Sequence, residues 1–342
     1  MSLLFLVYLA ASILFEKYTL KELVLICIIG LFLVLSYRNQ PDTTLLRVFL
    51  LVIAFKNFDF YKLIKFDMKL KIIGVFTVIF LHFAGIFEDV YLVREDYIRH
   101  SLGFIHPNRL ATYVCVIILQ WLVLRMHERK ITAYNYIVAI AIALITDAIT
   151  GSRTTLIIMM LGIFTSFFFY YIPRLSIKRN VIVRAISVFI VPVLSLVSYY
   201  IASGFDVRLE GWRNLDVLLS WRVSQMNNIY NNYGLSMLGQ EIHLISARVA
   251  REQGLDWIIL DNAYMALAIR FGVIILIIFS ILSIILQRRL LKGRKYELVM
   301  IANCFAVLGF TELQFYMIEF NFSLFAFIYL FQPNKQDLYI NL

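Results

Sequence analysis

Long apolar runs separated by short polar connectors recur along the whole chain. A helix needs about 20 apolar residues to cross a bilayer, and most of the runs approach that length. The pattern predicts about eleven membrane-spanning helices, at 1–15, 22–37, 44–56, 70–87, 109–125, 131–150, 154–172, 181–203, 261–286, 297–311 and 313–331. The third run is the shortest and could instead lie at the interface or be re-entrant.

The start of the chain and its composition agree with a membrane protein. Residues 1–15 lack a basic leading region and a small-residue cleavage site, so we expect a retained first span rather than a signal peptide. Of the 342 residues, 61% are hydrophobic and 16% are charged, which is too apolar for a soluble domain. No polar stretch is long enough to fold by itself. The sequence therefore predicts an all-α polytopic membrane protein with one integral membrane domain, 1–342.

The basic residues predict the orientation, because Lys and Arg concentrate in short cytoplasmic loops. The basic connectors 56–71, 125–130, 173–184 and 287–295 alternate correctly if all of them are cytoplasmic. The long segment 204–260 is then an extracytoplasmic loop. Within it, apolar and polar side chains separate onto two faces of a predicted helix at about 217–233, which is typical of a helix on the membrane surface.

This orientation leaves every lysine in the cytoplasm and only arginines on the outer side. Arginine binds phosphate through a planar fork and stays charged in partly dry sites, so an outer face rich in arginine suits a phosphorylated lipid. The alternative is that these arginines pair with outer acidic residues. The net charge of +10 comes partly from cytoplasmic loops near anionic lipid, and we expect no nucleic acid partner.

Several kinds of chemistry lack their signatures. The three cysteines lie in three different apolar runs, and the five histidines show no metal-ligand spacing. Neither a D-x-D motif for a metal-chelated nucleotide sugar nor a phosphate-binding loop for ATP is present. The sequence therefore predicts no metal and no cofactor, and the energy for any reaction would come from the substrate or from a gradient.

Four polar segments on the predicted outer side hold the candidate chemistry. They are "SLGFIHPNRLATY" (101–113), "DAITGSRTTLIIMM" (147–160), "SWRVSQMNNIYNNYG" (220–234) and "LDNAYMALAIRFG" (260–272). Each candidate also has a structural interpretation: His106 could cap a helix, Arg153 could pair with Asp147, and Asp261 could be a helix N-cap.

The order and spacing of these motifs, over about residues 100–275, resemble the Wzy-type polysaccharide polymerases and the related O-antigen ligases. The resemblance implies a metal-independent, inverting, lipid-dependent glycosyltransferase of GT-C-like fold in the bacterial cytoplasmic membrane. It would join undecaprenyl-diphosphate-linked oligosaccharide repeat units into an O-antigen, capsular or exopolysaccharide on the outer face. A flippase and a chain-length regulator of the same pathway are the protein partners that it implies.

Carried over by position, the resemblance implies that Arg153 of "TGSRTT" and Arg222 contact the diphosphate and that Asp261 is catalytic. Further candidate substrate contacts are His106, Asn108, Arg109, Asn262 and Tyr264. Asp261 stands where the ligases commonly have a histidine, and this departure favours polymerisation over ligation.

Glycosyl transfer from a lipid diphosphate needs an oriented hydroxyl, a base and cations for the leaving group. The alternatives are a ligase-like transferase, a lipid-linked oligosaccharide flippase, which should show repeated halves and charges within its spans, and a non-enzymatic scaffold.

Overall fold

The computed structural model describes residues 9, 11–94, 97–171, 180–245, 250, 254, 257–331 and 339–341. These residues are mostly helical. Among them, six helices are long and apolar enough to cross a membrane, and the chain is a multi-pass membrane protein of the all-α class. The six are α2 (Leu20–Asn39), α5 (Pro107–His127), α6 (Ala133–Thr150), α7 (Arg153–Tyr171), α8 (Val181–Gly204) and α13 (Val273–Lys292).

Three further helices fall short of a full apolar span. Both α3 (Thr44–Ala54) and α14 (Tyr296–Gly309) are apolar but short. The third, α4 (Phe60–Phe83), begins inside the predicted connector 56–71, and its first half includes lysines and Asp67. That half is amphipathic rather than apolar, so the predicted span 70–87 is only the second part of a longer helix.

The predicted total of eleven spans is not confirmed. Most of the first span, 1–15, lies outside the described residues. The predicted span 261–286 is divided into α12 (Ala263–Ala266), a π-helical turn η1 (Leu267–Phe271) and α13. The predicted span 313–331 consists of two 3-10 helices, η2 (Leu313–Tyr316) and η3 (Phe322–Leu330). Irregular backbone of this kind is tolerated at membrane depth where protein surrounds it, and η3 is largely buried.

The division before α13 has a local cause at Gly272. Its φ is +108°, and a Cβ there would lie 2.5 Å from the Met237 carbonyl oxygen. The loop around Met237 packs on this turn, with Val273 N donating to Ser236 O at 2.8 Å. The close approach of two backbones therefore requires glycine and interrupts the helix.

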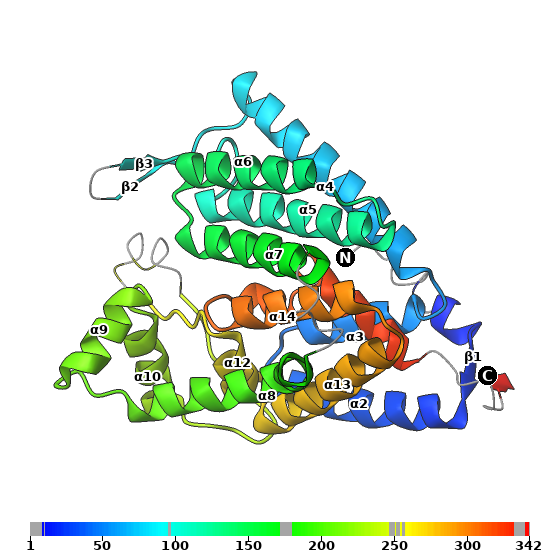
Figure 1. The fold of residues 1–342 in the computed structure, drawn as a ribbon. Coiled ribbons are helices and arrows are strands. Elements are labelled where there is room, and N and C mark those ends of the chain that lie inside the picture. The colour runs from blue at the N-terminus through cyan, green and yellow to red at the C-terminus, as the bar shows by residue number, and fades with distance from the viewer. Residues whose placement is uncertain are drawn as a thin grey trace.

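The helices pack in two layers (Figure 1). Helices α4, α5, α6 and α7 form one layer, and α2, α3, α8 and α13 form most of the other, with α14 packing on α5, α7, α8 and α13 between them. Small residues permit close packing: a Cβ at Gly162 of α7 would lie 2.2 Å from a methyl carbon of Leu119 in α5.

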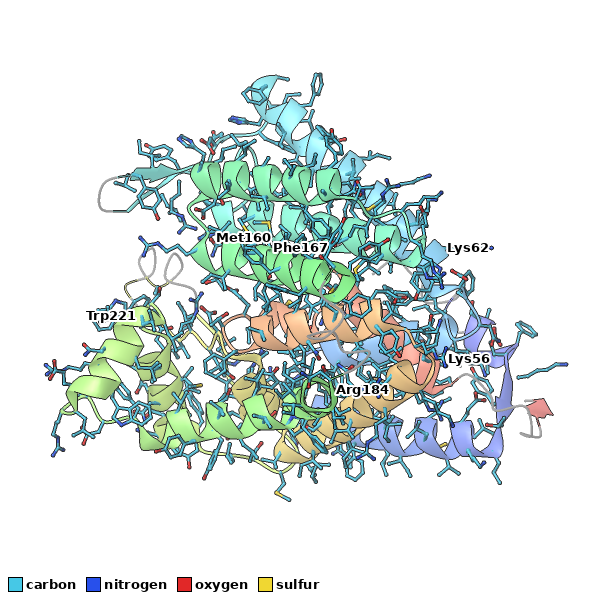
Figure 2. The ribbon with its side chains drawn as sticks, in the orientation of Figure 1. Lys56, Lys62, Met160, Phe167, Arg184 and Trp221 are labelled. Atoms are coloured by element: carbon cyan, nitrogen blue, oxygen red, sulfur yellow. The ribbon has the colours of Figure 1, made fainter. Side chains whose placement is uncertain are left out.

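The two ends of the bundle differ in their basic residues. One end, which we call the arginine end, holds the antiparallel pair β2 (Leu92–Arg94) and β3 (Tyr97–Arg99), and α9 (Glu210–Leu218) and α10 (Arg222–Tyr233). The opposite end, the lysine end, holds β1 (Lys17–Thr19), paired antiparallel with β4 (Tyr339–Asn341). Figure 2 places Lys56 and Lys62 at the lysine end and Trp221 at the other.

The predicted surface helix at 217–233 is two helices with a sharp break. Ser220 and Trp221 have φ values of +56° and +66°, and α10 begins only at Arg222. The Asp216 carboxylate stabilises the break by accepting a hydrogen bond from Ser224 N at 3.0 Å. The buried side of α10 packs on α8, where Asn227 donates to the Ala202 carbonyl at 2.7 Å. Residues 246–249, 251–253 and 255–256 of the predicted loop 204–260 lie outside the described residues.

Candidate functional site at the arginine end

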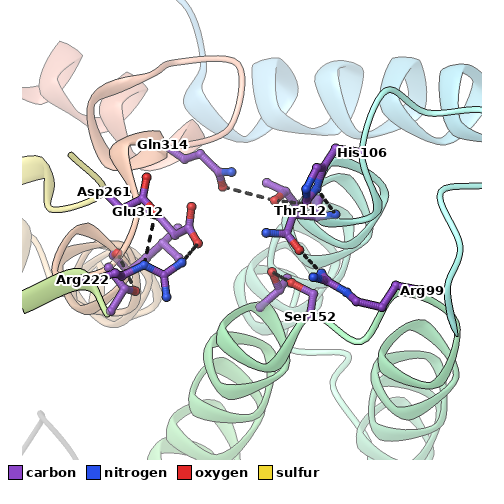
Figure 3. Close-up of polar contacts among 12 residues, drawn as sticks. Arg99, His106, Thr112, Ser152, Arg222, Asp261, Glu312 and Gln314 are labelled. Atoms are coloured by element: carbon purple, nitrogen blue, oxygen red, sulfur yellow. Dashed lines mark hydrogen bonds and ion pairs between the residues drawn. The ribbon is translucent and has the colours of Figure 1, made fainter. Parts of the chain in front are cut away.

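Three charged side chains from distant parts of the chain meet at the arginine end (Figure 3). Arg222 Nε lies 3.3 Å from Asp261 Oδ2, and Arg222 Nη2 lies 3.1 Å from Glu312 Oε1. The side chains of Arg222 and Glu312 are 19% and 17% exposed, whereas that of Asp261 is 34% exposed. Of the two carboxylates, Asp261 is therefore the more accessible to a substrate.

The backbone around each residue explains how the three side chains converge. Arg222 is the first residue of α10, directly after the left-handed Trp221, so the break sets its direction. Asn262 is the N-cap of α12, because its Oδ1 accepts from Met265 N at 2.9 Å. Asp261 is therefore not the N-cap, and the structural interpretation of its role is wrong. Its carboxylate is used instead in the contact with Arg222.

Asn262 fixes the position of Asp261. Its Nδ2 donates to Ser198 Oγ of α8 at 2.9 Å and to the Phe310 carbonyl at 3.0 Å. These buried hydrogen bonds join α8, α12 and the end of α14. They use both polar atoms of the Asn262 side chain, so few of its donor and acceptor positions remain for a substrate. Its structural role in the site is to hold the neighbouring carboxylate in place.

The two carboxylates hold protons more strongly than usual. Burial raises the pKa of Asp261, and the Arg222 guanidinium opposes this rise. Burial raises the pKa of Glu312 to about 7, where Arg222 lowers it, Asp261 raises it and the more distant charge of Arg109 lowers it. A carboxylate with a pKa near neutrality can both accept and release a proton at physiological pH.

A second polar cluster, from β3 and α5, adjoins the first. The Arg99 side chain donates to the Thr150 carbonyl at 2.7 Å and also to Asn108 Oδ1. Thr112 Oγ1 donates to the Asn108 carbonyl at 2.8 Å and lies 3.2 Å from Gln314 Oε1. Because Gln314 is two residues after Glu312, this contact connects the two clusters (Figure 3).

His106 caps α5. Its Nδ1 accepts a hydrogen bond from Asn108 N at 3.0 Å, so the imidazole carries its proton on the other nitrogen. Burial lowers the pKa of His106, and the positive charges of Arg99 and Arg109 lower it further. A neutral capping histidine agrees with the structural interpretation made from the sequence.

Arg153 does not pair with Asp147. It is exposed at the first position of α7, and among the described residues it forms no hydrogen bond or ion pair. One carboxylate oxygen of Asp147, Oδ1, is buried and likewise without a described partner. Arg109 is also exposed, and its guanidinium lies 4.8 Å from the centre of the Phe320 ring. Neither cation is neutralised by a described carboxylate within salt-bridge distance.

Two other arginines of the predicted outer side do pair with acids, and the partner of Arg208 is an outer acid, as the alternative interpretation expected. Arg208 lies 3.8 Å from Asp206, and Arg270 Nη2 lies 3.2 Å from Asp42 Oδ2. Tyr264 is fully buried, and its hydroxyl donates to the Ala306 carbonyl at 2.6 Å. Tyr264 is therefore closed to a substrate in this conformation and acts in packing.

Sequence reasoning had not selected Glu312, Gln314 or Arg99 for the site. A signal existed for Glu312, because an ionisable residue between two apolar runs usually faces a protein interior and a partner. Among the residues that the structure describes, no group of three His, Cys, Asp or Glu side chains is placed to hold a metal ion.

The site thus contains two carboxylates bound to one arginine, Arg222. Arg109 and Arg153, from two other predicted motifs, pair with no described carboxylate. Comparison of the chain with known protein families, with curated proteins and with solved structures finds no match. The resemblance to the polysaccharide polymerases therefore rests on the sequence motifs alone.

Proposed function

We propose that the protein is a polysaccharide polymerase of the outer face of the bacterial cytoplasmic membrane. It would transfer a growing glycan from undecaprenyl diphosphate to a hydroxyl of an incoming lipid-linked repeat unit, with inversion. The observation that carries the proposal is the Asp261–Arg222–Glu312 cluster at the arginine end of a membrane protein. It unites a candidate base with a cation, the two kinds of group that this reaction needs.

Arg109 and Arg153, which pair with no described carboxylate, suit the negative charge of the leaving diphosphate. Arg222 is balanced by its two carboxylates, so by itself it offers a diphosphate little net positive charge. Its Nε and Nη2 are used, while no described residue bonds to Nη1. Arg153, without a described partner, and Arg109, on the Phe320 ring, would supply the remaining charge. We propose that the diphosphate binds Arg153 and Arg222 Nη1, with Arg109 close by.

Asp261 and Glu312 would have different roles because their carboxylates differ in exposure. Asp261, the more exposed, would accept the proton of the acceptor hydroxyl as the new glycosidic bond forms and the bond to the diphosphate breaks. Glu312, the more buried, would hold Arg222 in position when it is ionised. A raised pKa makes Asp261 a stronger base than an ordinary aspartate once it is ionised.

The direct test is transfer by the purified, reconstituted protein. With an undecaprenyl-diphosphate-linked repeat unit as the only substrate, we expect a ladder of products. Asp261→Asn should lower the rate by about 100- to 10,000-fold, the usual contribution of a general base. Asp206→Asn is the matched control, because Asp206 is a half-exposed aspartate whose carboxylate pairs with Arg208 and not with Arg222.

The other candidate functions give different results in the same assay. Transfer of one glycan to a different acceptor without a ladder would indicate a ligase-like enzyme. Movement of the lipid-linked unit across the membrane without any new glycosidic bond would indicate a flippase. A wild-type ladder from both Asp261→Asn and Glu312→Gln would refute the proposed site.

A further inference from the structure

The antiparallel pair of β2 and β3 packs on the turn that joins α6 to α7. His100 N, directly after β3, donates to the Ile149 carbonyl at 2.9 Å. Arg99 Nε donates to the Thr150 carbonyl at 2.7 Å. Both carbonyls belong to the last turn of α6, where no amide of the same helix can reach them. The end of β3 therefore caps α6, and the guanidinium also complements the negative end of the helix dipole.

Gly151, the residue after α6, permits this close packing. Its φ is +55°, and a Cβ there would overlap a ring carbon of Tyr97 and lie 3.1 Å from Arg99 Cγ. The chain continues through Ser152 into Arg153, the first residue of α7. The end of β3 thus packs on the short stretch of backbone that sets the position of Arg153.

The guanidinium of Arg99 also reaches a second motif (Figure 3). Its Nη2 donates to Asn108 Oδ1 in the first turn of α5, where the next residue is Arg109. One side chain therefore connects the turn that holds Arg153 to the turn that holds Arg109. The planar fork of arginine aims its N–H groups at two acceptors in fixed directions, which a lysine ammonium does not do.

Asp89 fixes the backbone on the other side of Arg99. One oxygen of the Asp89 carboxylate accepts from Ser101 N at 2.8 Å and from Leu102 N at 3.0 Å. The other oxygen lies 2.5 Å from His100 Nδ1. Because Arg99 directly precedes this bonded segment, its backbone is anchored as well as its guanidinium.

We propose that Arg99 is a positioning residue for the diphosphate site, an inference that rests on the proposed function. Arg109 and Arg153 carry like charges and repel each other while no anion is bound. By fastening their two turns together, Arg99 keeps both guanidiniums at a separation that suits a single diphosphate. The neutral acceptors of Thr150 and Asn108 hold Arg99 in place without neutralising the two cations.

The first test compares the binding of two lipids to the full chain by native mass spectrometry in detergent. The lipids are undecaprenyl diphosphate, the proposed leaving group, and undecaprenyl phosphate. We expect the wild type to bind the diphosphate about tenfold more tightly, because the second phosphate engages a second arginine. Arg99→Gln should lose this preference by weakening the diphosphate complex alone, and Arg99→Lys should retain part of it. Arg213→Gln is the matched control, because Arg213 is an exposed arginine of α9 at the same end.

The second test measures the fastening itself and needs no lipid ligand. Spin labels replace Ile105, just before α5, and Ile157 of α7, both of which are exposed, in a Cys27→Ser background. Pulsed electron spin resonance should give a narrow distribution of distances between the labels. We expect a broader distribution in Arg99→Gln. Gly151→Ala, which forces β3 away from the turn, should broaden it while Arg99 is intact.

The outcomes separate this inference from the proposed function. A wild type that binds both lipids equally would refute the proposed diphosphate site itself. A preference for the diphosphate that survives in Arg99→Gln would overturn the positioning role alone. Weaker binding of both lipids with unchanged label distances would make Arg99 a direct ligand. A distance distribution as narrow in Arg99→Gln and Gly151→Ala as in the wild type would show that Arg99 only caps α6.

Discussion

Glu312 Oε1 lies 3.1 Å from Arg222 Nη2, although the two residues are 90 positions apart in the chain. The contact fastens the start of α10 to the segment that follows α14. Since Asp261 binds the same guanidinium, any change in the charge of Glu312 alters the electrostatic environment of Asp261, the candidate base.

The pH dependence of transfer should report this contact. The pKa of Glu312 is about 7, above its ordinary value, so Glu312 gains a proton as the pH falls through about 7 and its hold on Arg222 weakens. We expect the wild-type rate to fall below about pH 7. In Glu312→Gln this limb of the profile should disappear, because the amide does not titrate.

Glu319→Gln is the control for this measurement, since Glu319 is an exposed glutamate seven residues later in the chain. Its pH profile should match that of the wild type. An unchanged acid limb in Glu312→Gln would assign that limb to another group.

Arg153 should tolerate lysine poorly if it binds the diphosphate. Lysine keeps the charge but loses the planar fork that grips two oxygens, so Arg153→Lys should lower the rate of transfer by about 100-fold at normal protein level. The assay is the product ladder of reconstituted protein. Arg208→Lys is the matched control, because Arg208 is exposed and already pairs with Asp206. Equal ladders from both variants would move the diphosphate away from Arg153.

The orientation of the bundle can be tested by thiol labelling in intact cells. We expect a cysteine at Ser236, in the segment that packs near Gly272, to react with an impermeant reagent. A cysteine at Gly293, in the turn after α13, should react only after the membrane is opened. The reason is the concentration of lysines at the end that holds Gly293. The reverse labelling would place the candidate site in the cytoplasm.

Gly272 should be required for stability. Alanine there would force a side chain into a left-handed conformation with its Cβ 2.5 Å from the Met237 carbonyl oxygen. We expect Gly272→Ala to lower the free energy of unfolding by about 1–3 kcal/mol, measured as a lower thermal midpoint in detergent. Gly211→Ala is the control, because that helical position has no atom within 4 Å of the new Cβ and alanine favours helix. Equal midpoints for the two variants would contradict the steric argument.

Hydrophobic patterning predicted the helices whose environment is uniform. Helices α5, α6, α7 and α8 begin and end within a few residues of their predicted spans, since a continuous apolar run in a bilayer has one way to satisfy its backbone. Patterning failed where tertiary contacts decide the backbone. The run 313–331 is mostly apolar, yet packing against neighbouring helices permits 3-10 geometry there.

The site was predictable in part for the same reason. Arg222 and Asp261 stand out as charges beside apolar runs, and the structure brings them together. The position of Glu312 beside them depends on how α14 packs between the layers, which no local pattern records. The structure assigns Asn262 and Tyr264 to packing because hydrogen bonds to distant carbonyls, of Phe310 and Ala306, occupy their polar groups.

The contacts at the end of α2 also have an order of assembly. Ser36 and Gln40 at the end of α2 bond to the Phe271 carbonyl at 2.7 Å and to Ile242 N at 3.0 Å, more than 200 residues later in the chain. During synthesis the ribosome delivers α2 long before either partner exists. The end of α2 therefore stays undocked through most of translation and makes these two contacts only after the chain has been synthesised as far as Phe271.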